Sequence, residues 1–193
     1  MIKPMLAHKF DINRVDYSKP VYIQPKLDGV RCLFTKDGAY SRTNKKFMNV
    51  AHIELQLIPF FKNNPNTILD GELYNHELKN DFEKIISLVR KQKPTADDRL
   101  EAKQLMQYHV YDFITEDKAN YQDRMHNLAC SSIYSESIKY VPAYRVYKHE
   151  EALNMHHDAY LAKGYEGSIL RLDGPYKHGR SYDLMKFKDF SDT

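Results

Sequence analysis

The stretch Gln24-Pro25-Lys26-Leu27-Asp28-Gly29-Val30-Arg31 decides how this sequence is interpreted. It places Lys-x-Asp-Gly-x-Arg directly after an extended run, 21–26. A lysine held partly out of water beside other cations loses its proton more readily and becomes a better nucleophile. Asp28 can orient that amine or hold a metal ion, and Arg31 offers a planar fork to phosphate or ribose oxygens. Taken alone, the stretch also fits the start of a hairpin with solvated charges.

The residues that follow predict a β-hairpin in which two arginines converge. Asp37-Gly38 is a typical two-residue turn between two β-like runs. With that turn at the centre, Leu33 would lie opposite Arg42. Arg31 shares the face of Leu33, because every second residue of a strand points the same way. The converging arginines would suit a phosphate, and the alternative is an exposed face with two solvated arginines.

Periodicity and turn residues predict short strands mixed with amphipathic helices along the rest of the chain. The run 67–74 alternates around Asp70-Gly71 and predicts strand, turn, strand. Helices are expected at 81–90, 95–106, 121–133 and 150–163, and strands at 108–114, 138–147, 167–172 and 184–188. Because the strands and helices do not alternate as βαβ units, we expect an α+β fold with antiparallel sheets.

Composition places the chain among single-domain proteins of a reducing compartment. The 193 residues, 42% of them hydrophobic, suffice for one domain with a substantial core. A net charge of +3 is compatible with nucleic acid without being diagnostic of it. Cys32 and Cys130 are too few for a disulfide framework, which favours a cytoplasmic location. No apolar run is long enough for a signal peptide or membrane span, so we expect no membrane partner.

The opening stretch resembles the nucleotidyl-transfer motif of covalent nucleotidyltransferases, which include DNA ligases, RNA ligases and mRNA capping enzymes. Lys3-Pro4-Met5-Leu6-Ala7 is typical of ATP-dependent DNA ligases. Later segments resemble the other motifs of the superfamily in the right order: Ser41-Arg42-Thr43-Asn44-Lys45, Leu69-Asp70-Gly71-Glu72-Leu73-Tyr74, Tyr108-His109-Val110-Tyr111-Asp112-Phe113, Glu166-Gly167-Ser168-Ile169-Leu170-Arg171 and Leu184-Met185-Lys186-Phe187-Lys188. The resemblance implies one ATP-grasp-like nucleotidyltransferase domain over 1–193, built from two packed, mainly antiparallel sheets flanked by helices.

The chemistry implied by the resemblance is that of an ATP-dependent DNA ligase adenylation domain of the compact bacteriophage-like type, with roles in DNA repair, replication and recombination. Lys26 would attack the α-phosphate of ATP, form lysyl-AMP and release pyrophosphate. AMP would then pass to the 5′-phosphate of nicked double-stranded DNA, and the 3′-hydroxyl would displace it. Asp28, Lys186 and Lys188 are the other implied catalytic residues. Glu166 would hold Mg²⁺ or Mn²⁺, since a carboxylate with phosphate oxygens suits such ions.

The nucleotide contacts are also implied by the resemblance. Tyr111 and Ile169 would enclose the adenine ring. Gln24 stands where many DNA ligases carry glutamate; a glutamine oxygen can accept from the adenine amino group, but a glutamine also donates. We therefore predict that ATP is preferred over GTP. The implied nucleotide-binding residues are Gln24, Lys26, Arg31, Arg42, Glu72, Tyr111, Ile169, Lys186 and Lys188.

Two other functions remain open from the residues alone. One is an RNA ligase or a GTP-dependent capping enzyme, and the other is a nick-binding module with little activity in the first step. The early Lys-Pro-Met-Leu-Ala segment favours a DNA ligase, and retention of Lys26, Glu166 and Lys186 argues against a dead site. The OB-fold domain that normally follows in ligases is absent from the sequence, which leaves three alternatives open: an isolated adenylation domain of a longer parent protein, a naturally short protein, or an OB-fold domain supplied in trans by a partner.

Overall fold

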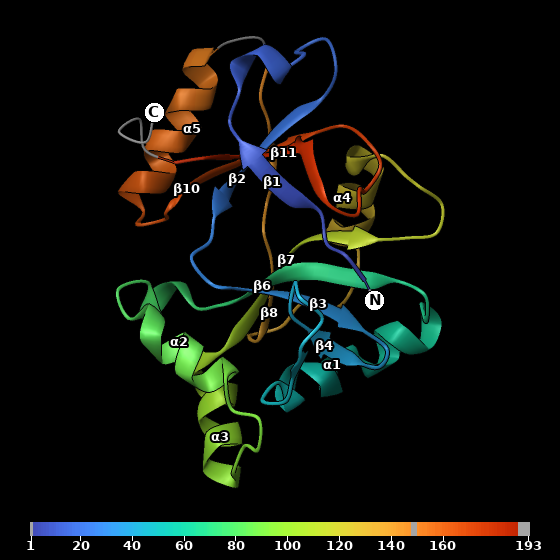
Figure 1. Ribbon diagram of the computed structural model, residues 1–193, viewed down its shortest axis with the longest axis vertical. Helices are drawn as coiled ribbons and strands as arrows, with labels where there is room; N and C mark the ends of the chain where they lie inside the picture. The colour runs from blue at the N-terminus through green and yellow to red at the C-terminus, as the bar shows by residue number, and fades with distance from the viewer. Residues whose placement is uncertain (1, 148–149, 189–193) are drawn as a thin grey trace.

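Two β-sheets stacked along the long axis form the frame of the molecule in the computed structural model, which describes residues 2–147 and 150–188 (Figure 1). The first sheet, at the top of Figure 1, has the strand order β1 (Leu6–Lys9), β11 (Arg180–Phe187), β10 (Gly167–Leu172), β2 (Val21–Lys26) and β9 (Tyr144–Arg145). The second sheet has the order β5 (Lys46–Phe47), β4 (Gly38–Tyr40), β3 (Val30–Thr35), β6 (Ile68–Tyr74), β7 (Gln107–Ile114) and β8 (Ile138–Tyr140). Neighbouring strands are antiparallel except β1 with β11 and β7 with β8, so the predicted α+β fold of mainly antiparallel sheets is confirmed.

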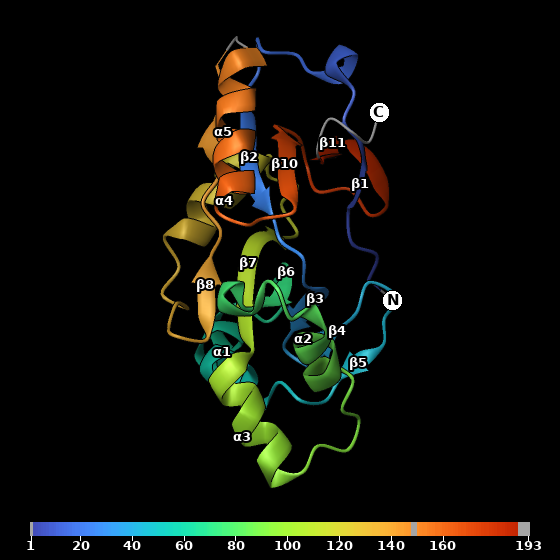
Figure 2. The ribbon, with the colours of Figure 1, turned by 90° about the vertical axis from the view of Figure 1, so that its left-hand side faces the viewer.

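The helices lie around the two sheets (Figure 2), and a cleft lined by residues of both sheets lies between them. The helices are α1 (Ala51–Asn63), α2 (Phe82–Val89), α3 (Ala96–Leu105), α4 (Tyr121–Ala129) and α5 (Glu150–Ala162), with short 3₁₀ turns at Ile12–Arg14 and His76–Leu78. Helix α5 packs against β2 and β10, α4 packs against β7, and α2 packs on β3 and β6. No helix in the described part of the chain is long and apolar enough to cross a membrane.

Each sheet has its own core on the side away from the cleft. Val21, Ile23 and Leu170 of the first sheet pack with Leu153 and Tyr160 of α5. In the second sheet, Cys32 and Phe34 are fully buried with residues of α1 and α2, as the alternation of β3 predicts. The opposite face of each sheet therefore points toward the other sheet.

The register of the predicted hairpin is wrong, although the two arginines still converge. Lys36 and Asp37 form the turn, and Leu33 pairs with Tyr40 rather than with Arg42. Gly38 is the first residue after the turn and has φ 129°, a conformation that a side chain disfavours. The shift is two residues, and a two-residue shift preserves the faces of a strand. Arg31 and Arg42 still line the same cavity, but Arg42 reaches it from the loop after β4 rather than from a strand face.

The predicted turn at Asp70-Gly71 is also wrong, since β6 runs straight through both residues. A side chain at Gly71 would place its Cβ 2.3 Å from the carbonyl oxygen of His109, so the glycine permits a close approach of β7. The register between β6 and β7 shifts between Asp70 and Gly71, where Asp70 pairs with Asp112 and Gly71 with Val110. Tyr111 is the extra residue of this β-bulge.

Most of the other predicted elements are present, but β1 was not predicted, and β11 begins at Arg180 rather than at the expected position 184. The helix expected at 95–106 is present as α3, and a capping box begins it, with Thr95 and Asp98 satisfying each other's backbone N–H groups. The expected strand over 138–147 is split into β8 and β9, which belong to different sheets. Helix α1 was missed, because Pro59 lies inside it and proline normally interrupts a helix.

Candidate active site

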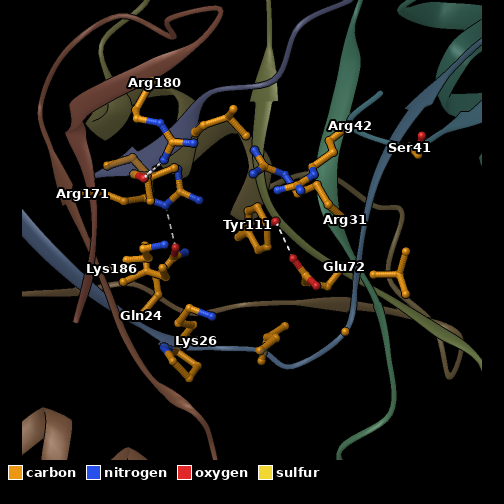
Figure 3. Close-up of a pocket in the computed structure, with 18 of the residues that line it drawn as sticks. Gln24, Lys26, Arg31, Ser41, Arg42, Glu72, Tyr111, Arg171, Arg180 and Lys186 are labelled. Carbon is orange, nitrogen blue, oxygen red and sulfur yellow. Dashed lines mark hydrogen bonds between the residues drawn. The ribbon is translucent and has the colours of Figure 1, made fainter. Parts of the chain in front are cut away.

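A cavity of about 660 Å³ lies between the facing sides of the two sheets (Figure 3). Its walls carry many charged and hydrogen-bonding groups rather than a continuous apolar lining. The residues that line it are Leu6, Ala7, Gln24, Pro25, Lys26, Leu27, Gly29, Val30, Arg31, Ser41, Arg42, Thr43, Glu72, Tyr111, Ile169, Arg171, Arg180, Leu184 and Lys186.

The first-sheet wall is built by regular strand alternation. Ile169 of β10 pairs with Gln24 of β2 on one side and with Lys186 of β11 on the other. Lys26 and Arg171 lie two positions along from this row, and alternate residues of a strand share a face. All five side chains therefore reach the cavity, where Figure 3 shows Gln24, Lys26, Arg171 and Lys186 together.

One carboxylate joins two lysines at the end of this wall. Nζ of Lys26 donates to Oε2 of Glu166 at 2.7 Å, and Nζ of Lys188 lies 2.9 Å from Oε1 of the same residue. Partial burial would raise the pKa of Glu166, but the hydrogen bonds and charges of the two lysines outweigh burial and lower that pKa. Glu166 is thus an ionised group that holds Lys26 in one direction.

The second-sheet wall rests on a buried ion pair. Arg31 donates from Nε and Nη2 to the two oxygens of Asp70, at 2.6 and 2.7 Å, and Asp70 is fully buried. The hydroxyl of Tyr176 also donates to Asp70, at 2.7 Å, and accepts from the backbone N–H of Met5 at 2.9 Å. These contacts fasten the N-terminal segment and the loop before β11 to the second sheet.

Glu72 and Tyr111 form a second polar pair on this wall. The Tyr111 hydroxyl donates to Oε1 of Glu72 at 3.0 Å, as the dashed line in Figure 3 shows. Burial raises the pKa of Glu72 to about 7, although Arg31 and the Tyr111 hydroxyl act in the opposite direction. A carboxyl group that titrates near neutral pH on the wall of a cavity marks a candidate functional position.

A buried polar chain connects the two walls. Asp112 accepts from Nε of Arg124 at 2.9 Å and from Nη1 of Arg171 at 3.0 Å. Arg171 in turn donates from Nε to Oε1 of Gln24 at 2.6 Å, and Gln24 donates from Nε2 to the carbonyl oxygen of Val141 at 3.2 Å. The chain therefore joins β7 of the second sheet to β10 and β2 of the first.

The structure brings most of the residues singled out in the sequence to this cavity. Lys188 lies just beyond β11 and contacts Glu166, and Arg42 reaches the cavity from the exposed loop after β4. Asp28 is exposed on the turn after β2 and is not among the residues that line the cavity.

Several residues of the site have no role that the sequence motifs predict. They share burial and ion-pair or hydrogen-bond contacts that only the folded chain shows: Asp70, Asp112, Arg124, Arg171 and Tyr176. Asp70, Asp112 and Arg171 stand inside the quoted motifs. Each of these three is a charged residue within an otherwise apolar strand. Such residues are seldom buried unless they are paired, so this pattern could have indicated buried ion pairs.

The cavity suits a metal ion only in combination with a ligand. No group of three or more histidine, cysteine or carboxylate side chains is placed to hold a metal within 2–147 and 150–188. Glu166 supplies carboxylate oxygens beside two lysine nitrogens. Mg²⁺ is commonly held by one or two carboxylates together with substrate phosphates, so the donor set fits a nucleotide-bound Mg²⁺.

Comparison with known proteins gives a consistent family and fold. The family model described as ATP dependent DNA ligase domain matches residues 4–188. A search of curated proteins found no match. Among solved structures, a Lig E DNA ligase has a TM-score of 0.76 at 21% identity, with 98% of this chain and 69% of that chain covered.

Viral ligases have the same fold. The Chlorella virus DNA ligase-adenylate has a TM-score of 0.71 at 26% identity, with 97% of this chain and 67% of that chain covered. The ligase of bacteriophage T7, solved in complex with ATP, has a TM-score of 0.72 at 18% identity, with 96% and 68% covered. A structure named Pmar-Lig is matched over 46% of its length, so the chain spans from about half to two thirds of these structures.

Proposed function

Because this chain belongs to the family of ATP-dependent DNA ligase domains, we propose that Lys26 takes AMP from ATP and that the domain passes it to DNA. One observation carries this proposal. Nζ of Lys26 lies in the cavity between the sheets, hydrogen-bonded at 2.7 Å to the ionised Glu166. A neutral lysine can keep one N–H donated to that carboxylate while its lone pair points at phosphorus. Glu166 would therefore orient the nucleophile as well as share in holding Mg²⁺.

The transfer forms a bond between Nζ and the α-phosphorus and breaks the bond to the pyrophosphate leaving group. The amine loses a proton in this step, and negative charge builds on the phosphoryl oxygens. Lys186 on the cavity wall, Lys188 at its rim and Arg42 on the loop after β4 are the cations placed to stabilise that charge. Mg²⁺, when bound, would neutralise part of the same charge.

We assign recognition of the nucleoside mainly to the second-sheet wall. The Tyr111 ring and Ile169 line the cavity and would contact the two faces of the base. Glu72 would accept from ribose hydroxyls. Nε of Arg31 donates to Asp70, and Nη2 donates both to Asp70 and to the carbonyl oxygen of Met5. We therefore assign Nη1 to a ribose or phosphate oxygen.

Nicked double-stranded DNA is the substrate we propose for the second half of the reaction. Arg42 and Arg180 stand at the mouth of the cavity, where the 5′-phosphate of a nick could meet the adenylated lysine. An OB-fold domain, in the parent protein or in trans, would complete the DNA-binding surface. A cytoplasmic location belongs to the same proposal.

Incubation with α-labelled ATP and Mg²⁺, followed by a denaturing gel, tests the assignment of Lys26. The unmodified protein should carry label, and Lys26→Ala should carry none. Lys26→Arg should also fail, because a guanidinium stays protonated and is not nucleophilic. Lys103→Ala, at an exposed position of α3, is the matched control and should label normally. Label that survives in Lys26→Ala would show that another residue is the nucleophile.

A further inference from the structure

We propose that Arg171 sets the base preference of the cavity by fixing which way the side-chain amide of Gln24 faces. The inference rests on the proposed adenylation of Lys26, since it concerns the base of the same nucleotide. Arg171 acts here through Gln24 and is a positioning residue.

The amide of Gln24 has a single orientation because its two known partners have opposite character. Gln24 is only 2% exposed, yet it lines the cavity. Its Oε1 accepts from Nε of Arg171 at 2.6 Å, and its Nε2 donates to the carbonyl oxygen of Val141 at 3.2 Å (Figure 3 shows the first bond). A guanidinium can only donate and a carbonyl can only accept, so exchanging the oxygen and nitrogen would break both hydrogen bonds.

Arg171 can impose this orientation because it is itself immobilised. It is 3% exposed, and its Nη1 donates to Asp112 at 3.0 Å. Asp112 is 1% exposed and also accepts from Arg124, which donates further to the carbonyl oxygens of Ala119 and Gly174. Loosening any member would leave a buried charge incompletely paired, which is strongly unfavourable.

The fixed amide distinguishes adenine from guanine. One lone pair on Oε1 and one hydrogen on Nε2 remain for a ligand, which matches the amino group and the adjacent ring nitrogen of adenine. Guanine presents an oxygen and an N–H in the reverse order, so it would need the amide turned around. The side chain of an unrestrained glutamine can turn and bind either base. The amide held by Arg171 and Val141 instead places its own oxygen against the guanine oxygen, and two acceptors cannot form a hydrogen bond.

Competitive labelling with ATP and GTP tests the inference, with the ratio of the two labels measured within each variant. The unmodified protein should prefer ATP. Arg171→Met should lower the ATP to GTP ratio about 10-fold or more, because the amide can then reverse. Arg171→Lys, which retains a donor, should keep most of the preference. Because each ratio is internal to one preparation, partial loss of folded protein does not affect it.

A second background separates action through Gln24 from direct action on the base. In Gln24→Met there is no amide to orient, so adding Arg171→Met should leave the ratio of that background unchanged. If Arg171→Met lowers the ratio equally in both backgrounds, Arg171 acts on the base directly and the inference is wrong. Asp112→Asn removes the charged partner of Arg171. It should lower the ATP to GTP ratio when Gln24 is present and leave the ratio unchanged in Gln24→Met. This variant replaces Arg171→Met in the experiment if Arg171→Met does not fold.

The outcomes separate this inference from the proposed function. Absence of label from both nucleotides in the unmodified protein would contradict the adenylation of Lys26. Label with an ATP to GTP ratio that does not respond to Arg171→Met or Asp112→Asn would contradict only the role of Arg171.

Discussion

The two walls of the cavity differ in how their charged side chains are paired and buried. On the first-sheet wall, Lys26 and Lys188 share Glu166, and the three side chains remain partly exposed to solvent. On the second-sheet wall, Arg31 is clamped by Asp70, and the carboxyl group of Glu72 titrates near neutral pH because it is buried. The Lys26–Glu166–Lys188 cluster of the first wall is thus held by partly exposed ion pairs, whereas the Arg31–Asp70 pair of the second wall is buried.

This difference separates reaction from recognition. A nucleophile must lose a proton and move toward phosphorus, and a partly exposed ion pair that contributes little stability permits that movement. Binding of one nucleoside benefits from groups that are already in place before the ligand arrives. We therefore expect changes in the Lys26–Glu166–Lys188 cluster to affect rate, and changes in the buried pairs of the second wall to affect stability and affinity.

Glu166→Gln should have the largest effect and should sharpen this contrast. The substitution removes the negative charge and turns one of the two oxygens into an NH2 donor, so Lys26 and Lys188 cannot both stay hydrogen-bonded and the proposed Mg²⁺ site loses its charge. We expect lysyl-AMP formation to slow by ~10²–10³-fold. The free energy of unfolding should change by at most about 1 kcal/mol, because the ion pairs are partly exposed. A rate measured in single turnover, beside a thermal melt, checks both; a large fall in the melting temperature would contradict the small contribution of these ion pairs to stability.

Asp70→Asn should show the opposite pattern. The substitution leaves the Arg31 guanidinium buried without its charged partner, which typically costs about 3–5 kcal/mol of stability. Chemical denaturation measures this loss. Asp37→Asn, on the exposed turn of the hairpin, is the matched control and should leave stability nearly unchanged. Equal stability of the two variants would mean that the Arg31–Asp70 pair does not hold the wall.

Glu72→Gln should stabilise the protein increasingly as the pH rises above about 4.5. The pKa of Glu72 rises from an ordinary 4.5 to about 7. Between these values the folded protein keeps a proton that the unfolded chain releases, so stability falls as pH rises from about 4.5 through 7. The variant should therefore be more stable by ~1–3 kcal/mol at pH 8 and show no advantage near pH 4.5. A pH-independent difference between the two proteins would show that Glu72 does not titrate in this range.

Tyr111→Phe should have the smallest effect. It keeps the ring that we assign to base contact and removes the hydroxyl that donates to Glu72. A net hydrogen bond contributes about 0.5–1.5 kcal/mol, so we expect the KM for ATP in self-adenylation to rise roughly 3- to 10-fold with little change in kcat. Tyr134→Phe, outside the cavity, controls for loss of a tyrosine hydroxyl. A fall in kcat at unchanged KM would place the hydroxyl in the reaction rather than in binding.

Much of the first wall could be predicted from the sequence because it depends on local rules. The strands 21–26 and 167–172 have the expected bounds, and alternation alone puts Lys26 on the same face as Gln24. Pro25 has no backbone N–H to donate, and on that side of the strand β9 pairs only with Tyr22 and Ile23. The capping box of α3 is likewise a signal confined to four consecutive residues.

The second wall depended on contacts that no local pattern contains. The bulge at Tyr111 breaks the alternation of β7, so that Asp112 faces the first sheet together with its neighbour. Arg171 lies 59 positions from Asp112 and finds it only when the sheets are stacked. The motif residues and the character of each strand were thus determined by the sequence, whereas the pairing of buried charges was decided by the tertiary structure. The physical reason is that periodicity acts between near neighbours, but a buried charge requires a partner, and the partner comes from another part of the chain.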